Sequence, residues 1–106
     1  MNEQIEKYLS GMEAWRADRL SRFQQDFLDE LVLAEIKHPS WCCDAVHGAA
    51  ILAEESGELT QAAIDFHYNG GSDEDRERMR AEAVQCGAMA LRFLLALDNY
   101  KPRGQA

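Results

Sequence analysis

The residues of this chain best suited to chemistry are carboxylates that recur at helical spacing in two separate segments. Glu54, Glu55 and Glu58 stand close together in the first segment, and Glu82 stands in the second with Gln85 one helical turn beyond it. Side chains three or four residues apart share a helix face, so each segment presents two oxygen donors together. Such oxygen-rich sets on facing helices suit Mg²⁺ or Mn²⁺. The sequence therefore predicts a divalent-cation site between two helices.

Helical-wheel positions separate these acids from ordinary surface glutamates. At about 100° per residue, Glu55 falls inside an apolar arc, Glu58 lies at its margin, and Glu82 falls in the middle of an apolar stripe. An ionised carboxylate at a core position is costly unless its charge is compensated, and a shared cation would compensate it. The alternative is a solvated helix face, where clustered glutamates usually lie. The arc consists of Leu52, Leu59, Ala62, Ala63 and Phe66, and the stripe of Met79, Cys86, Met89, Phe93 and Leu97.

A long amphipathic helix is expected to precede these acids. Residues 2 to 36 are rich in helix formers, with a break expected near Gly11. Pro39 ends this helix, because it disfavours helical geometry at the residue before it. The apolar residues that recur along one side of this segment are Trp15, Leu20, Phe23, Phe27, Leu28 and Leu31.

Two further helices are expected to carry the acids themselves. One runs from about residue 44 to residue 66 and ends at the Asn-Gly-Gly of residues 69 to 71. Ser72, with Asp75 three residues on, is typical of an N-cap for the next helix, which extends to about residue 97. The predicted fold is all-α, with three main helices forming a core of the four-helix-bundle type that homo-oligomerisation completes.

The two acidic segments resemble the MazG-like all-α nucleoside triphosphate pyrophosphohydrolases. The resemblance rests on Ile-Leu-Ala-Glu-Glu-Ser-Gly-Glu-Leu at residues 51 to 59, on Ala-Glu-Ala-Val-Gln at 81 to 85, and on Met-Ala-Leu-Arg-Phe-Leu at 89 to 94. The family signature is Glu-Glu-x-x-Glu, then a gap of one to two dozen residues, then Glu-x-x-Asp. The similarity covers roughly residues 41 to 97.

This resemblance implies a Mg²⁺ site and a reaction. Glu55, Glu58 and Glu82 take the positions of magnesium ligands, while Gln85 stands where the family has aspartate and offers a carbonyl oxygen without charge. Glu54 or Glu55 is implied as the base that orients water for attack on the α-phosphorus of a nucleoside triphosphate. The products are nucleoside monophosphate and pyrophosphate. The family builds its site in a four-helix bundle from two chains or closely packed repeats.

Residues before the second helix supply candidate substrate contacts. His38 and Trp41 could stack on a nucleobase, and Lys37 could contact phosphate, with solvated surface charge as the alternative for Lys37. A second interpretation of this segment is a zinc site of His38, Cys42, Cys43 and His47, although the spacing matches no common zinc finger. Free thiols packed in a loop are the simpler expectation.

The composition limits the classes of partner. A chain of 106 residues with 46% hydrophobic residues is expected to be one domain, residues 1 to 106, and three helices bury enough apolar surface only with another copy, as homodimer or homotetramer. The net charge of −8 argues against polymeric nucleic acid. Without a signal-like start or a membrane-length apolar run, a cytoplasmic protein with no membrane partner is expected.

Two functions of different classes remain open from the sequence. The first is a Mg²⁺-dependent nucleoside triphosphate pyrophosphohydrolase of the nucleotide-pool housecleaning type, which the joint presence of Glu55, Glu58 and Glu82 favours. The second is a catalytically silent helical bundle that acts as an interaction or regulatory module, which Gln85 favours. Turnover of nucleotides with Mg²⁺ distinguishes them.

Overall fold

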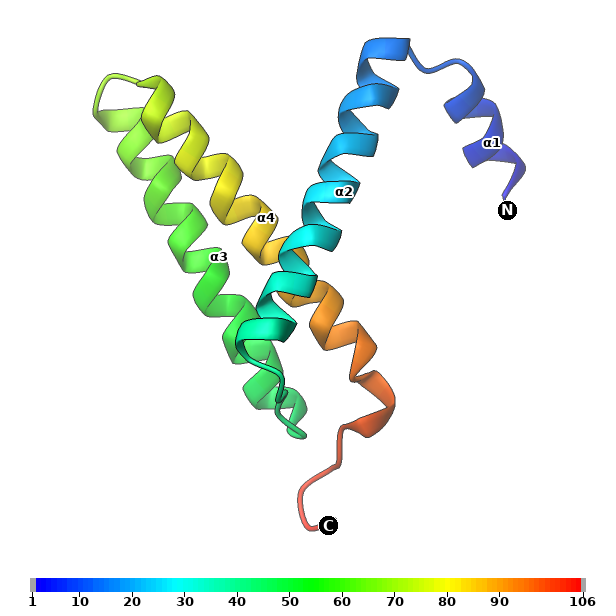
Figure 1. Cartoon of the computed structure of the whole chain (residues 1–106), viewed down its shortest axis with the longest axis vertical. Coiled ribbons are helices and arrows are strands. Elements are labelled where there is room, and N and C mark those ends of the chain that lie inside the picture. The colour runs from blue at the N-terminus through cyan, green and yellow to red at the C-terminus, as the bar shows by residue number, and fades with distance from the viewer. Residues whose placement is uncertain (1, 106) are drawn as a thin grey trace.

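The computed structural model describes residues 2–105, and the regular structure within them is entirely helical, as predicted (Figure 1). The break expected near Gly11 is present and separates a short helix from a long one. A short 3₁₀ turn, Leu97–Asn99, follows the last helix, which therefore ends slightly before the predicted boundary. The four α-helices are α1 (Glu3–Ser10), α2 (Ala14–Lys37), α3 (Ala45–Tyr68) and α4 (Asp73–Leu95).

Local side-chain bonds fix where the helices begin. The Asp44 carboxylate accepts from the backbone N–H of Val46 at 2.8 Å, and the Ser72 hydroxyl accepts from that of Asp75 at 3.1 Å. Each satisfies a donor that the first turn of a helix leaves unpaired. Between α3 and α4, Gly70 and Gly71 both have positive φ, which permits the tight reversal. The two helices therefore form an antiparallel hairpin, called here the α3–α4 hairpin.

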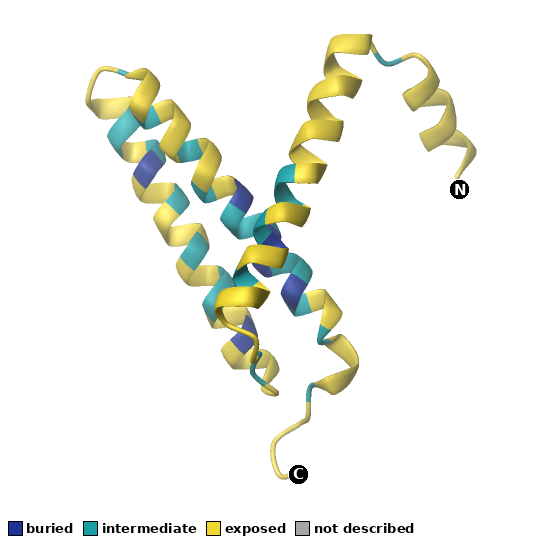
Figure 2. Cartoon of the chain, in the orientation of Figure 1, coloured by how far each residue is buried: buried dark blue, intermediate teal, exposed yellow. Residues whose placement is uncertain are grey.

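Helix α4 is the central element. One side packs along α3 within the hairpin, and α2 crosses the other side (Figure 1). At the crossing, Gly87 brings α4 very close to Phe27, because a Cβ at Gly87 would lie only 2.8 Å from the nearest ring carbon. Buried residues concentrate around this crossing, as Figure 2 shows, with Leu31 of α2 packed against Ala88 and Met89 of α4.

The connection between α2 and α3 is fixed by the end of α4. Arg92 is buried and donates to the carbonyl oxygens of His38 at 2.7 Å and Ser40 at 3.4 Å. Its guanidinium lies over the Trp41 ring, 4.9 Å from the centroid. The Trp41 indole donates to the Tyr100 hydroxyl at 2.8 Å. These bonds hold the loop and the C-terminal segment together at one end of the molecule.

The first half of α2 departs from the sequence expectation. The sequence predicts that its apolar stripe faces the core, but Leu31 is the one buried residue of α2. Trp15 remains 58% exposed and Phe23 40% exposed. The reason is geometric, because α2 diverges from the α3–α4 hairpin toward its N-terminus and carries α1 away with it (Figure 1). Among the described residues, no helix has the length and apolar character to cross a membrane.

Candidate metal centre

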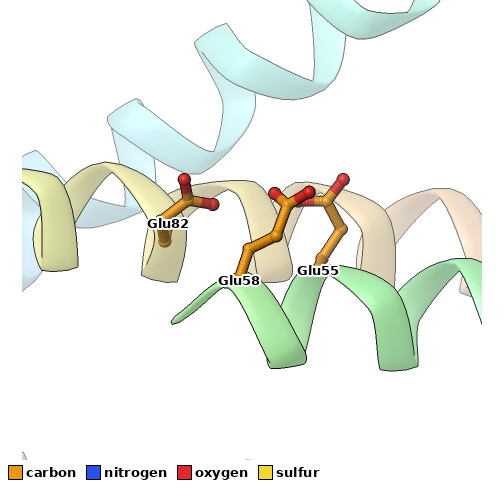
Figure 3. Close-up of side chains that lie close together, drawn as sticks. All are labelled: Glu55, Glu58 and Glu82. Atoms are coloured by element: carbon orange, nitrogen blue, oxygen red, sulfur yellow. The ribbon is translucent and has the colours of Figure 1, made fainter. Parts of the chain in front are cut away.

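Three of the predicted ligands converge on one place. One carboxylate oxygen from each of Glu55, Glu58 and Glu82 lies within 4.8 Å of the other two. Figure 3 shows the three side chains pointing to the same side of the α3–α4 hairpin, two from α3 and one from α4. Within residues 2–105 this is the one such group of three or more histidine, cysteine or acidic side chains. The arrangement offers several oxygen ligands to a hard divalent cation.

The hairpin geometry produces this convergence. Glu55 and Glu58 are one turn apart and share a face of α3. The antiparallel return of α4 sets Glu82 opposite them, and the complete burial of Ala62 on α3 reflects the close approach of the two helices. Glu55 and Glu82 are half-buried, whereas Glu58 is exposed. The acids that the sequence places on two helices therefore lie close together in the structure, and their role as metal ligands stays a prediction.

The convergence of like charges shows in the acid–base behaviour of the site. Burial raises the pKa of Glu55, and the nearby carboxylates of Glu58 and Glu82 raise it further. Burial also raises the pKa of Glu82. Glu58 raises it further, through its negative charge and through a hydrogen-bonding contact. Both acids therefore hold a proton more readily than a free glutamate. A bound cation would reverse this effect, because it favours the ionised forms.

A basic residue lies one turn before Glu82 but is already paired. The positive charge of Arg78 offsets part of the rise in the pKa of Glu82 that burial and Glu58 cause. However, the Arg78 guanidinium donates to Asp65 at 2.7 Å, and Asp65 also accepts from Gln61 at 3.0 Å. Asp65 is thus neutralised by Arg78, and it does not join the three glutamates.

Gln85 has a different partner from the one expected. Its amide nitrogen donates to the Glu30 carboxylate of α2 at 2.6 Å, in a partly buried contact. The bond joins α4 to α2 at their crossing. The assignment of Gln85 as a fourth metal ligand stays a prediction, which requires the amide to leave Glu30 or to present its carbonyl oxygen to the cation.

The other sequence candidates lie around this centre or away from it. Glu54 is exposed and adds to the negative charge around Glu55. Lys37 and His38 are exposed at the end of α2, and Trp41 is half-buried with one ring face occupied by Arg92. Ala45 precedes Glu55 by about 15 Å of helix, at 1.5 Å per residue. A single ligand that contacts both the residues before α3 and the three glutamates must therefore extend along α3.

The residues considered for zinc are not assembled. His38, Cys42, Cys43 and His47 do not form a converging group in the described chain. Cys42 is half-buried and its thiol lies 3.6 Å from the Asp44 carbonyl oxygen, while Cys43 is exposed rather than packed. Cys86, expected in the core, is half-buried, and its pKa is raised by burial and by the three nearby glutamates.

Glu30 is the polar residue that the sequence reading missed. It lies on the same side of α2 as Phe27 and Leu31, the residues that face α4. An acid within an apolar helix face was the signal that identified Glu82, so the same test applied to α2 would have identified Glu30. What the test could not supply is its partner, which lies far along the chain.

Comparisons of the chain with family models, with curated proteins and with solved structures found no match. The MazG-like resemblance therefore rests on residues 51–59, 81–85 and 89–94 alone.

Proposed function

We propose that this protein is a nucleoside triphosphate pyrophosphohydrolase that uses Mg²⁺ or Mn²⁺ held by Glu55, Glu58 and Glu82. The observation that supports the proposal is the convergence of three carboxylates from two helices. Grouped negative charges in a partly buried position oppose one another, and a divalent cation offsets that repulsion. The positions of these acids also match the metal ligands of the family that the two segments resemble.

Each acid has a role in the proposed reaction. A divalent cation held at the site would neutralise the charge of the substrate phosphates and lower the pKa of a bound water molecule. Glu55 and Glu58 of α3 and Glu82 of α4 would hold this cation, and the cation would in turn attract the substrate phosphates to the hairpin. Glu54, exposed beside Glu55, orients the attacking water and accepts its proton, and Glu55 is the second candidate for this step. Attack at the α-phosphorus then releases nucleoside monophosphate and pyrophosphate.

The substrate contacts of the proposal lie at the end of α2 and in the loop before α3. Lys37 and His38 are exposed and free to meet a phosphate or a base in solution. Trp41 already contacts Arg92 on one face and Tyr100 through its indole nitrogen. Stacking of a nucleobase on Trp41 therefore has to use the opposite face of the ring.

The test is a turnover assay with matched variants. Purified protein is incubated with Mg²⁺ and a panel of ribo- and deoxyribonucleoside triphosphates, and pyrophosphate release is measured with and without a chelator. Glu82→Gln should abolish metal-dependent turnover and leave the metal-free fold as stable as the parent or more so, because it removes one of three opposing charges. Circular dichroism melting checks the stability.

Glu77→Gln is the matched control, since Glu77 is on the same helix but pairs with Arg80 outside the cluster. It should retain turnover and lose only the small contribution of an exposed ion pair. Equal turnover by Glu82→Gln and the parent would show that the proposed site is wrong.

The bond between Gln85 and Glu30 favours a second candidate function, the catalytically silent interaction module. Because Gln85 is bonded to α2, a cation at this site would have three carboxylate ligands. It would lack the fourth carboxylate ligand that the family pattern has. A silent bundle is expected to bind Mg²⁺, measured by calorimetry, without hydrolysing any nucleotide of the panel. Pyrophosphate release that depends on Glu82 would exclude it.

A further inference from the structure

The chain exposes far more surface than a compact protein of its mass. Its accessible surface is 8210 Å², whereas a folded monomer of 12.0 kDa is expected to expose about 6,000 Å². The Cα radius of gyration is 17.0 Å, against about 13 Å for a compact domain of this length. The excess of about 2,200 Å² exceeds the roughly 800 Å² that each partner buries in a standard interface.

An apolar groove lies between α2 and the α3–α4 hairpin. The groove has a volume of about 660 Å³ and lies where α2 diverges from the hairpin. Figure 2 shows the diverging half of α2 exposed along its length. Its apolar lining includes Leu20, Phe23 and Phe27 on α2, and Leu59, Met79 and Val84 on the hairpin.

We propose that a second copy of this chain fills the groove with residues 3–24, called here the arm. The arm consists of α1 and the first half of α2, and it contains no buried residue. Ile5, Leu9 and Trp15 are each about half exposed. A helical segment of this kind gains most of its stability from packing an apolar face, and an equivalent groove on a second copy offers that packing.

Charge decides which part of the second copy enters the groove. Residues 3–24 carry four acidic and four basic side chains, so the net charge of −8 belongs entirely to the rest of the chain. Two hairpins facing each other would bring like charges together, whereas an arm with no net charge approaches the acidic hairpin without net repulsion. Arg16, Leu20 and Phe23 share one face of α2, which presents a basic residue along with apolar ones.

The exchange is reciprocal, because each copy has one arm and one groove. A two-fold arrangement in which the same surface serves both chains closes without leaving either groove open. The groove also adjoins the three glutamates, since Leu59 follows Glu58 and Met79 lies one turn from Glu82. The inference does not depend on the proposed hydrolysis, and its test uses no activity.

The first experiment compares two substitutions by light scattering at micromolar concentration. The parent should have at least twice the 12.0 kDa mass of one chain. Phe23→Arg should dissociate the assembly by placing a charge in the groove, while Tyr68→Arg, at a more exposed apolar position (76%) outside the groove, should leave it intact. Circular dichroism verifies that both variants remain helical. A monomeric parent, or dissociation by Tyr68→Arg instead of Phe23→Arg, would overturn the proposal.

A second measurement is independent of any variant's ability to fold. Isotope-labelled and unlabelled parent chains are mixed, and contacts between chains are detected by isotope-filtered NMR. Contacts between the arm aromatic Trp15 of one copy and the Met79 methyl of the other are expected. An oligomer whose intermolecular contacts omit the arm would contradict the proposal even if its mass were as expected.

Discussion

Two of the three converging glutamates, Glu55 and Glu82, are in environments that disfavour their charge when no cation is bound. Glu55 and Glu82 are half-buried, and both face Glu58. Burial and like charges act in the same direction on a carboxylate, raising its pKa. Groups tuned in this way are candidates for function, because a purely structural role would be served at lower cost by a neutral side chain.

We expect mild acidification to stabilise the metal-free protein. The folded-state pKa values of Glu55 and Glu82 are raised above the usual 4.5, so their destabilising effect is present above those values and disappears as the pH falls toward 4.5. With chelator present, the melting temperature should therefore be higher at about pH 5 than at about pH 7. Mg²⁺ should raise the melting temperature more at pH 7, since its ligands must be ionised.

The Glu82→Gln variant is the control for this pH dependence, because the overall charge of −8 also decreases on acidification. Its metal-free stability should vary less with pH than that of the parent. At still lower pH the trend reverses, because the pKa of Asp65 is lowered by its hydrogen bond from Arg78 and that of Glu77 by its hydrogen bond from Arg80. A parent and a variant with identical profiles would contradict the electrostatic account of the site.

Gln85→Asp tests the position that departs from the family pattern. The new carboxylate would lie one turn from Glu82 and should tighten Mg²⁺ binding about tenfold, as an anionic oxygen replaces a neutral one. The metal-free protein should be destabilised for two reasons. The new carboxylate adds to the repulsion near Glu82. The substitution also removes the amide donor that now bonds Glu30. Calorimetric titration and melting measure the two effects separately.

The structure supplies a control for this substitution. In the double variant Glu30→Gln with Gln85→Asp, the donor and the acceptor exchange places, so the contact between α2 and α4 is restored with opposite polarity. The double variant should recover part of the lost metal-free stability. Equal stability of the single and double variants would show that the Glu30 contact is not what the substitution disrupts.

At the scale of the elements, the position of α4 between α2 and α3 depends on small residues. Ala62 lies at the contact of α3 with α4, while Gly87 and Ala88 lie at the crossing of α4 with α2. Small side chains allow helix axes to approach closely and leave room for a large residue from the partner, here Phe27. The sequence stripe of α4 included Met89, which packs against Leu31 of α2, but it did not include Gly87 or Ala88 at the same crossing.

Two glycine-to-alanine substitutions should have opposite effects on stability. In Gly87→Ala the new Cβ would lie 2.8 Å from the Phe27 ring, and such overpacking costs about 1–3 kcal/mol. In Gly57→Ala, within α3, the Cβ meets nothing within 4 Å, and the better helix propensity stabilises by up to about 1 kcal/mol. Chemical denaturation measures both, and combining Gly87→Ala with Phe27→Leu should recover stability. A stabilising Gly87→Ala would mean that α2 does not cross α4 at this point.

At the scale of the whole molecule, stability should depend on protein concentration. If residues 3–24 fill the groove of a second copy, unfolding is coupled to dissociation, and the melting temperature rises as the protein is concentrated. Calorimetric scans over a hundredfold range of concentration would measure this rise. Phe23→Arg should melt at a temperature independent of concentration, and Tyr68→Arg should behave as the parent. A constant melting temperature for the parent would point to folding as a single chain.

The sequence by itself determined the features that depend on neighbouring residues. The helix starts at Asp44 and Ser72, the break near Gly11 and the reversal at Gly70 all follow from local backbone chemistry. The meeting of Glu55, Glu58 and Glu82 also followed, because it requires only two helical periods and one tight turn between them.

Only the tertiary structure decided which helix faces meet across long stretches of chain. Helix α2 crosses α4 at Phe27 and Gly87. The place of this crossing brings Gln85 to Glu30. It also buries Leu31 and leaves Phe23 exposed. A helical wheel assigns a side to each residue but carries no information on where along its length a helix meets its partner. The contact holding Gln85 and the exposure of the arm depend on that position.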